Sequence, residues 1–505
     1  MDSKLSDPKQ RLIKNIFSNW ASMLVSIAIA FFMSPFLVHN LGKEQYGIWA
    51  LALSLIAYSH FLDAGMRQSL ARYIPKHYAT RDFQKLNEVL SSSNAIYAIT
   101  GSLVIIGTLV IALFFAEYFH VSSELLDVMK ITFLLVGLNE ALRFYFITSS
   151  ALGPFHRYDI GNVIDILTTI ANALLIFYFI GKGYALITLA VITVSTALSR
   201  FVIRAIYQKR LVPEIEYKFK YVNKAVIREL LGYGVISFFI VMAWMVIFNT
   251  DNIVIGFFLG TTEVTFYSIA GMMINYLRTL INAIGIPLVP AISHFDANSD
   301  HSQIAGLYTK LSRYLYYLTA CIAIGILFYG AKFIYLWMGP DFTSTVKVLY
   351  ILIIPAAIYL PQVAANSVLL GISRHKILLN ILIAEALVNI GLSVALVKPL
   401  GIIGVALGTA IPQFIIYSFV YPYVFHRIIK LGLKTFYLTN LKMALIAIAL
   451  TVPLSFVISR YNPLTGWPGL ITNTAIFCTL AGAGFLLWVL DTDDRTKLLA
   501  RLRIN

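Results

Sequence analysis

Charged side chains stand in the middle of apolar stretches of this 505-residue chain, where charge is costly and therefore informative. Two of them are the arginines Arg143 and Arg278. A guanidinium group presents a planar fork of N–H donors that suits phosphate and other oxyanions. For Arg278 we weigh two hypotheses, contact with an anionic ligand and an ion pair that locks two helices together. His60 is a weaker polar or titrating group that would accompany Arg278 in the first of these.

Carboxyl groups occupy similar positions. Glu140 precedes Arg143 by three residues, which places both side chains on one helix face and lets them neutralise each other. In the alternative, an anionic ligand competes for Arg143 and frees Glu140 to bind a proton. Glu385 has no partner in its own apolar stretch. It is therefore a protonated carboxyl, the partner of a cation on another helix, or an ion-coupling group.

Three aspartates complete the set of candidate residues. Asp251 lies in the polar stretch Asn249–Asn252, and hydrogen bonds between helices explain such a girdle as well as an ion-coupling role does. Asp63 and Asp165 lie near the ends of apolar stretches, where water is close. For those two we expect a structural or gating role.

The composition defines the elements that must carry these groups. Hydrophobic residues make up 59% of the chain and charged residues 12%, and the mean hydropathy is +0.79, far outside the usage of soluble proteins. We therefore expect an all-α, polytopic membrane protein with about 14 transmembrane helices. The apolar stretches are residues 16–37, 46–62, 95–115, 131–152, 163–180, 184–203, 231–259, 264–289, 315–338, 348–370, 377–397, 402–424, 443–458 and 470–490.

The basic residues predict an orientation. Of 39 Lys and Arg residues, 30 fall in the termini and alternate gaps on one side of the expected membrane, and 7 fall on the other. By the positive-inside rule, both termini are cytoplasmic. Topology and contact with anionic lipid then explain the net charge of +15 without a nucleic-acid partner.

An internal repeat appears when the chain is shifted by 218 residues. The turn that begins Leu41-Gly42 then matches Leu259-Gly260, and the turn that begins Leu152-Gly153 matches Leu370-Gly371. Because each unit has an even number of spans, the repeat is parallel, and two six-helix lobes should face each other.

This repeat predicts the division of the chain. Residues 1–208 form the first lobe, 209–229 a basic cytoplasmic linker, and 230–430 the second lobe. Residues 431–505 hold two extra C-terminal helices and a cytoplasmic tail.

Enzyme motifs are missing from the sequence. It contains no phosphate-binding Gly-rich loop with Lys-Ser/Thr, no His-Glu-x-x-His and no clustered Cys/His ligands. We therefore expect no catalytic residues, no cofactor and no metal site. Cys321 and Cys478 both fall inside expected spans and are interpreted as buried apolar side chains.

Short motifs near the beginning of each lobe resemble the oligosaccharide flippase branch of the MATE/MOP superfamily, the Wzx-like O-antigen flippases. The motifs are Pro35, Leu41-Gly42, Tyr46–Trp49 and Asp63–Met66 in the first lobe, and Thr250–Gly256, Leu259-Gly260, Tyr267 and Pro287–Ser293 in the second.

The resemblance implies a carrier in a bacterial inner membrane that works by alternating access. Its cargo would be a polyprenyl-pyrophosphate-linked oligosaccharide, such as the O-antigen unit of lipopolysaccharide, moved from the cytoplasmic to the periplasmic leaflet. Protons or Na⁺, membrane lipids and a polysaccharide polymerase or chain-length machinery are the implied partners. Arg278, Arg143 and His60 would then bind the anionic head, and Glu140, Glu385 or Asp251 would exchange the ion. A MATE-type H⁺ or Na⁺ antiporter of drugs or cations and a peptidoglycan-precursor flippase are the alternatives.

Overall fold

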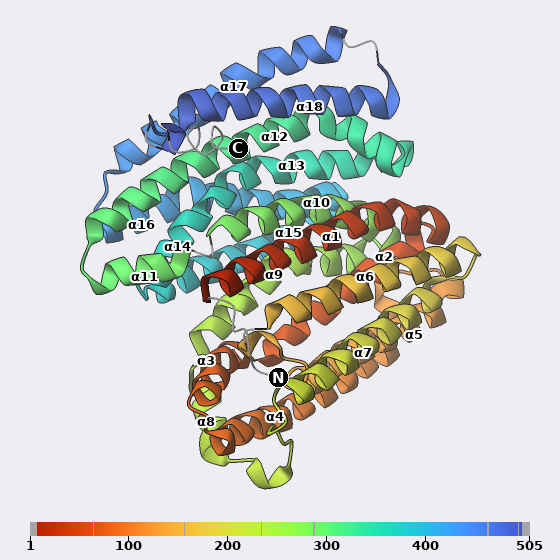
Figure 1. Ribbon diagram of the computed structural model, residues 1–505. Coiled ribbons are helices and arrows are strands. Elements are labelled where there is room, and N and C mark those ends of the chain that lie inside the picture. The colour runs from red at the N-terminus through yellow and green to blue at the C-terminus, as the bar shows by residue number, and fades with distance from the viewer. Residues whose placement is uncertain are drawn as a thin grey trace. The chain divides into compact units, whose positions relative to one another are not determined.

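The computed structural model describes residues 8–63, 65–155, 157–233, 235–285, 288–461, 464–492 and 494–496. Within these ranges every regular element is a helix or a helical turn, as Figure 1 shows. Among the described residues, 11 helical stretches are long and apolar enough to cross a membrane. The expected all-α, multi-pass architecture is therefore confirmed.

The expected number of 14 spans is not confirmed, and the shortfall has three local causes. The helix α2 (Lys43–Ala57) has 15 residues and continues as the 3-10 turn η1 (Tyr58–Asp63), so it is too short to qualify alone. The helix α5 (Leu126–Phe146) is long enough, but four of its 21 residues are charged. The third cause is α15 (His375–Ile415), which joins two of the expected stretches in one run of 41 residues.

The run α15 is a hairpin of two antiparallel helices. A straight helix of this length would extend about 60 Å, twice the hydrocarbon thickness of about 30 Å. Gly401 interrupts it with φ 60° and ψ −143°, a conformation that favours glycine. Contacts then join the two sides. The Asn389 amide donates to the Thr409 hydroxyl at 2.8 Å, and the Tyr417 hydroxyl donates to Glu385 Oε2 at 2.9 Å.

The chain divides into two compact units, residues 1–265 and 266–505. In the first, the helices α3, α4, α5 and α8 share a core that includes Met66, Leu90, Tyr97, Phe144 and Leu230. Besides α2, η1 and α5, its elements are α1 (Pro8–Leu41), α3 (Met66–Ala79), α4 (Phe83–Val110), η2 (Ile111–Phe115), η3 (Ala116–Phe119), η4 (Ser123–Leu125), η5 (Gly153–Phe155), α6 (Tyr158–Gly181), α7 (Leu186–Leu211), η6 (Phe219–Tyr221), α8 (Lys224–Tyr233) and α9 (Val235–Phe258).

In the second unit the last two helices pack against α12, where Tyr317, Cys321, Met443 and Phe477 share one core. The two extra C-terminal helices expected from the repeat thus contribute to the core of this unit. The helix α10 (Thr261–Gly285) contains the boundary, and the lobe limits expected from the repeat stay predictions. Besides α10 and α15, the elements are α11 (Val289–Ala297), α12 (His301–Met338), η8 (Pro340–Phe342), α13 (Thr343–Tyr359), η9 (Leu360–Gln362), α14 (Val363–Gly371), η10 (Ile416–Val420), α16 (Tyr421–Ile429), α17 (Leu433–Tyr461), α18 (Gly466–Gly484) and η11 (Phe485–Val489).

Local geometry recurs at the shift of 218 residues. Gly42 before α2 has φ 83°, and Gly260 before α10 has φ 95°. Arg81 before α4 has φ 55°, and Ser299 before α12 has φ 56°. A positive φ in a non-glycine residue is uncommon, so its recurrence at the same shift supports the repeat independently of sequence matches.

Each of these non-glycine turns is followed by an aspartate that begins a long helix. Asp82 accepts a hydrogen bond from the Lys85 backbone N–H, and Asp300 accepts one from that of Gln303, both at 3.1 Å. These are N-caps, which satisfy a backbone donor that the helix leaves free. The bond from the Lys85 N–H lowers the pKa of Asp82.

The segment between α7 and α8 is hydrogen-bonded along α4. The Asn87 amide donates to the Glu214 carbonyl at 3.1 Å and accepts from the Glu216 N–H at 2.9 Å. The Ser92 hydroxyl accepts from the Asn223 N–H at 2.9 Å. The expected linker, residues 209–229, is therefore docked within the first unit.

Candidate functional site

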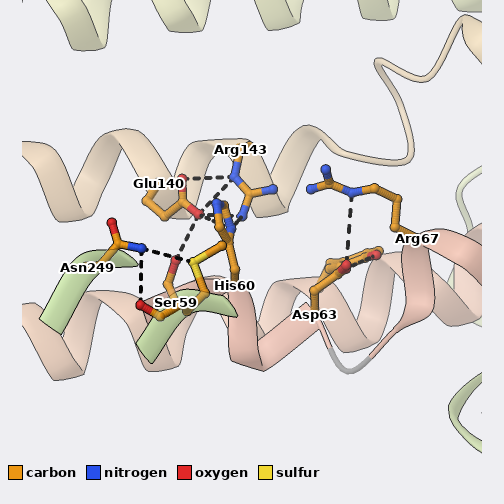
Figure 2. Close-up of polar contacts among 9 residues, drawn as sticks. Ser59, His60, Asp63, Arg67, Glu140, Arg143 and Asn249 are labelled. Carbon is orange, nitrogen blue, oxygen red and sulfur yellow. Dashed lines mark hydrogen bonds and ion pairs between the residues drawn. The ribbon is translucent and has the colours of Figure 1, made fainter. Parts of the chain in front are cut away.

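The turn η1 and the helix α5 bring together four polar side chains, which we call the Glu140 cluster: Ser59, His60, Glu140 and Arg143 (Figure 2). Arg143 Nε donates to both carboxylate oxygens of Glu140 at 2.8 Å, and Arg143 Nη2 also contacts Oε1. The Ser59 hydroxyl donates to Glu140 Oε1 at 2.8 Å. The ion pair expected from the three-residue spacing is therefore present.

His60 joins this cluster through Arg143. Its Nδ1 lies 2.9 Å from Arg143 Nη2 and 3.5 Å from Glu140 Oε1. Because a guanidinium only donates hydrogen bonds, Nδ1 must be the acceptor. This geometry requires a neutral His60 with its proton on Nε2. The cluster then has no net charge, and a second proton on His60 would break its contact with Arg143.

Asp63, at the end of η1, is held by α4 and α3. The Tyr97 hydroxyl donates to Asp63 Oδ1 at 2.6 Å, and Arg67 Nε lies 3.9 Å from Oδ2 (Figure 2). Tyr97 is completely buried. These contacts fit the structural role expected for Asp63.

Asp251 is buried on α9, between two residues that bind α2 and η1. Thr250 is hydrogen-bonded to Tyr58, and the Asn252 amide donates to the Ser54 hydroxyl at 2.9 Å. Tyr58 also lies within electrostatic range of Asp251. The neighbours of Asp251 thus join helices within the first unit, as expected for an interhelical polar girdle.

Arg278 lies in the second unit, on α10. Its Nη2 donates to Asn275 Oδ1, one helical turn earlier, at 2.5 Å. Tyr359, at the end of α13, lies within electrostatic range of both Arg278 and Glu385.

Glu385 lies in the α15 hairpin and is 1% exposed. Its Oε2 accepts from Tyr417, and the Gln413 side chain lies beside the carboxyl. Its Oε1 is buried without a hydrogen-bond partner in the described part of the chain. No basic side chain among the described residues lies within ion-pair distance of it. Of the alternatives left open by the sequence, an ion pair with a cation on another helix is therefore not the one observed.

Asp165 lies on α6 and contacts two arginines of α7. Arg204 Nη2 is 2.6 Å from Asp165 Oδ2, and Arg200 Nε is 3.9 Å from Oδ1. Neither arginine was expected as a site residue, because both stand at the edge of an apolar stretch. The signal that could have found them is their four-residue spacing, which puts both on one face of α7.

An apolar cavity of about 800 Å³ lies in the second unit. Side chains of α10, α12, α13 and α18 line it, among them Met273, Phe333, Leu349 and Phe477. Cys321 and Cys478 also line this cavity. Cys321 is buried, as expected, whereas Cys478 is exposed, so the burial expected for it is wrong. Among the described residues, no group of three or more His, Cys, Asp and Glu side chains is placed to hold a metal ion.

Solved structures share this architecture. The chain is similar to a structure of the lipid II flippase MurJ, with a TM-score of 0.73 at 14% identity over 98% of this chain and 100% of that one. It is also similar to an inward-facing multidrug resistance MATE family transporter of the MOP superfamily, with a TM-score of 0.67 at 15% identity over 82% and 96% of the two chains. The fold is therefore that of a multi-pass membrane protein of the MATE/MOP type.

Sequence comparison gives the family. A family described as polysaccharide biosynthesis protein matches residues 12–296, more than half of the chain, and the chain belongs to it. The membrane protein EpsK of Bacillus subtilis is 22% identical over 97% of both chains. The membrane protein MJ1068 of Methanocaldococcus jannaschii is 21% identical over 81% of this chain and 83% of its own. The resemblance expected from the short motifs is confirmed.

Proposed function

We propose that this protein is a flippase that moves a polyprenyl-pyrophosphate-linked oligosaccharide across a bacterial inner membrane by alternating access. The observation that carries the proposal is the intramembrane guanidinium of Arg278 in a member of the polysaccharide biosynthesis protein family. A sugar pyrophosphate is polar and anionic, so it needs a cationic site along its path through hydrocarbon.

Arg278 binds the pyrophosphate directly in this proposal, because its guanidinium presents a planar fork of N–H donors that suits phosphate oxygens. Arg143 has a different role, because Glu140 already neutralises it. An anionic head that reaches Arg143 competes with Glu140. His60 accepts from Arg143 through Nδ1, so its Nε2–H is a second donor for the head. The three residues act on the same ligand chemistry at different points of its passage.

The lipid part of the cargo needs no polar site. Its apolar chain can stay in hydrocarbon, and the cavity lined by α10, α12, α13 and α18 offers an apolar surface for it inside the second unit. Arg278 lies on one of the helices that line this cavity. In this proposal α10 thus contacts both the anionic head and the apolar chain of one ligand.

Ion coupling is assigned to Glu385 ahead of Glu140 and Asp251. Glu140 accepts bonds from Arg143 and Ser59, so its charge is compensated. Glu385 has a buried oxygen without a donor, and the groups facing it are Gln413, Tyr417 and Tyr359. Transport into vesicles should therefore respond to an imposed pH gradient, and Glu385→Gln should abolish that response. Equal rates with and without the gradient would remove ion coupling from the proposal.

A MATE-type antiporter of drugs or cations is the second candidate, because its fold is shared and Glu385 is a carboxyl without a basic partner in the described residues. A peptidoglycan-precursor flippase shares the cargo chemistry proposed above. Drugs and cations differ in charge from a lipid-linked oligosaccharide, and loss of the gene should therefore have different effects on the cell for the two classes of cargo.

Deleting the gene and following the cell surface tests the proposal. We expect loss of surface polysaccharide and accumulation of lipid-linked repeat units, rescued by the unchanged gene and by Arg278→Lys in part, but not by Arg278→Ala. Unchanged surface polysaccharide together with altered sensitivity to cationic drugs would contradict the proposal and favour the antiporter. Loss of cell-wall integrity with unchanged surface polysaccharide would favour the peptidoglycan precursor.

A further inference from the structure

A line of polar contacts joins α6 to α7 within the first unit. Nearest the turn between the two helices, the Asn172 amide donates to the Thr196 hydroxyl at 2.8 Å. One helical turn further from that turn, Arg200 Nε donates to the Thr168 hydroxyl at 3.0 Å. Polar contacts of this kind between membrane helices satisfy groups that lipid cannot.

The line ends in a charged group formed by Asp165, Arg200 and Arg204. Arg204 Nη2 donates to Asp165 Oδ2 at 2.6 Å and to the Gly161 carbonyl at 3.1 Å. Arg200 Nε lies 3.9 Å from Asp165 Oδ1. Two guanidinium groups thus share one carboxylate, which leaves one positive charge in excess among these side chains.

Several N–H donors of the two arginines have no acceptor among the residues that the structure describes. Each guanidinium has five N–H groups, and none of them can accept. Within the described ranges, Arg200 donates through Nε alone, so both of its terminal nitrogens are available to a ligand. Arg204 Nε is buried without a partner in the described residues. The side chains of Arg200 and Arg204 are 32% and 23% exposed, so a ligand can reach them.

The span expected at residues 184–203 would place these donors near one end of the hydrocarbon, with Arg204 just beyond the span and Arg200 three residues within it. Arg204 and Arg200 precede the end of α7 at Leu211 by seven and eleven residues, or about 10 Å and 16 Å along the helix axis. On the partner helix α6, Leu167 and Leu174 are exposed apolar side chains, 63% and 64% exposed. Near the edge of the hydrocarbon a guanidinium loses part of its contact with water, and the phosphate group of an anionic lipid can supply acceptors for it.

The corresponding contacts in the second unit lack these cations. In the α15 hairpin an amide donates to a hydroxyl near the turn, from Asn389 to Thr409. One step further, the carboxyl of Glu385 meets Gln413 and Tyr417, which are both neutral. The excess positive charge is therefore found in the α6–α7 pair and is not shared by the corresponding contacts of the α15 hairpin.

We propose that Arg200 and Arg204 form a binding site for the phosphate group of an anionic membrane lipid. Asp165 orients Arg204, and Gly161 leaves room for it, because a Cβ at that position would lie 3.1 Å from Arg204 Nη2. The bound phosphate accepts hydrogen bonds from the terminal nitrogens of both arginines and compensates their excess charge. The site belongs to the lipid leaflet at the Lys209 end of α7 and does not depend on the cargo proposed above.

Native mass spectrometry of the full-length protein in detergent tests this site, with phosphatidylglycerol as the anionic probe and phosphatidylcholine as the neutral one. We expect phosphatidylglycerol to bind at lower concentration than phosphatidylcholine. Arg200→Gln and Arg204→Gln should each weaken phosphatidylglycerol binding about tenfold, because each removes charge-assisted hydrogen bonds. The matched control is Arg210→Gln, which removes an exposed arginine from the last turn of the same helix and should leave binding unchanged.

Two further variants separate folding from binding. Arg200→Lys and Arg204→Lys keep the charge near Asp165 but lose the planar fork, so they should fold normally and bind phosphatidylglycerol with intermediate strength. Size-exclusion chromatography and circular dichroism monitor the fold of every variant.

Three results would overturn the proposal. Equal phosphatidylglycerol binding by all variants would mean that the bound lipid surrounds the protein without a specific site at these arginines. Equal binding of phosphatidylglycerol and phosphatidylcholine to the unchanged protein would remove the role of lipid charge. Displacement of phosphatidylglycerol by millimolar inorganic phosphate would assign the site to free phosphate rather than to a lipid.

Discussion

The carboxylate of Glu140 receives donors from its own helix and from a distant turn. Arg143 lies three residues along α5, and Ser59 lies on η1. Burying a carboxylate in an apolar environment is tolerated only when charge and hydrogen bonds compensate it. Glu140 and Arg143 therefore stabilise each other in this apolar setting.

Glu140→Gln should destabilise the protein, because it leaves the Arg143 guanidinium partly buried without a negative partner. Breaking a fully buried pair costs about 3–5 kcal/mol, and the partial exposure of this pair reduces the expected loss to about 2 kcal/mol in the free energy of unfolding. A fall in the thermal unfolding midpoint of the purified protein in detergent measures it.

Glu117→Gln is the control for this substitution. Glu117 lies 3.9 Å from Lys130, and its side chain is 72% exposed, so its loss should change the free energy of unfolding by less than about 1 kcal/mol. If both variants unfold at the temperature of the unchanged protein, the Glu140 cluster does not stabilise the first unit.

The sequence predicts contacts between residues that are close along a helix and fails for contacts across the fold. The pair Glu140 and Arg143 follows from helix geometry alone. Ser59 is 81 residues away from Glu140, and no local pattern links the two. Arg200 was missed for another reason. It stands at the end of an apolar stretch, where the boundary between span and loop is uncertain by several residues.

At the scale of elements, the two helices of α15 pack closely because glycines lie where they meet. A Cβ at Gly408 would come within 2.6 Å of the Ser393 backbone nitrogen. Gly404 lies one turn away on the same face and also meets the opposite helix at Leu396. Small residues four apart allow backbones to approach in membrane helix pairs.

Gly408→Ala should therefore lower the free energy of unfolding by about 1–3 kcal/mol, because the new methyl group overlaps backbone atoms that cannot move freely. Gly391→Ala in the same hairpin is the matched control. Nothing lies within 4 Å of a Cβ at Gly391, so this change should be neutral or stabilise the helix by about 0.5–1 kcal/mol. Thermal unfolding of both variants measures the difference, and a Gly391→Ala variant that is the less stable of the two would contradict this packing.

The apolar pattern predicts where spans lie better than how the backbone runs through them. It places a break between residues 397 and 402, and the structure has Gly401 there. It also predicts a span at residues 46–62, but not that α2 ends at Ala57 and continues as the turn η1. Hydropathy indicates whether a segment lies in lipid or in water. It does not distinguish an α-helix from the tighter 3-10 turn that positions Ser59 and His60.

At the scale of the whole molecule, the repeat is visible in backbone geometry as well as in sequence. The positive φ angles of Arg81 and Ser299 and the N-caps Asp82 and Asp300 recur at one shift. The sequence matches that suggested the repeat lie elsewhere in the chain, in the turns after Leu41 and Leu152. Two independent signals at the same spacing support a parallel repeat, in which both units enter the membrane from the same side.

The orientation of these units is a prediction that reporter fusions test. Alkaline phosphatase fused after Gly183, in a gap with few basic residues, should be active outside the cytoplasm, and the same reporter fused after Lys430 should be inactive. A fluorescent protein fused to the C-terminus should fluoresce, as it does only when it folds in the cytoplasm. The opposite pattern would invert the topology and with it the proposed direction of transport.

The central claim is that an arginine inside the membrane carries a pyrophosphate-linked oligosaccharide across it. Its most direct test is the rate at which this lipid appears on the far side of vesicles that contain the purified protein. We expect the unchanged protein and the exposed-turn control Arg374→Ala to move the lipid at the same rate, and Arg278→Ala to be at least about tenfold slower, because it loses a charge-assisted contact. An Arg278→Ala protein as fast as the unchanged one, or an unchanged protein no faster than empty vesicles, would contradict the claim.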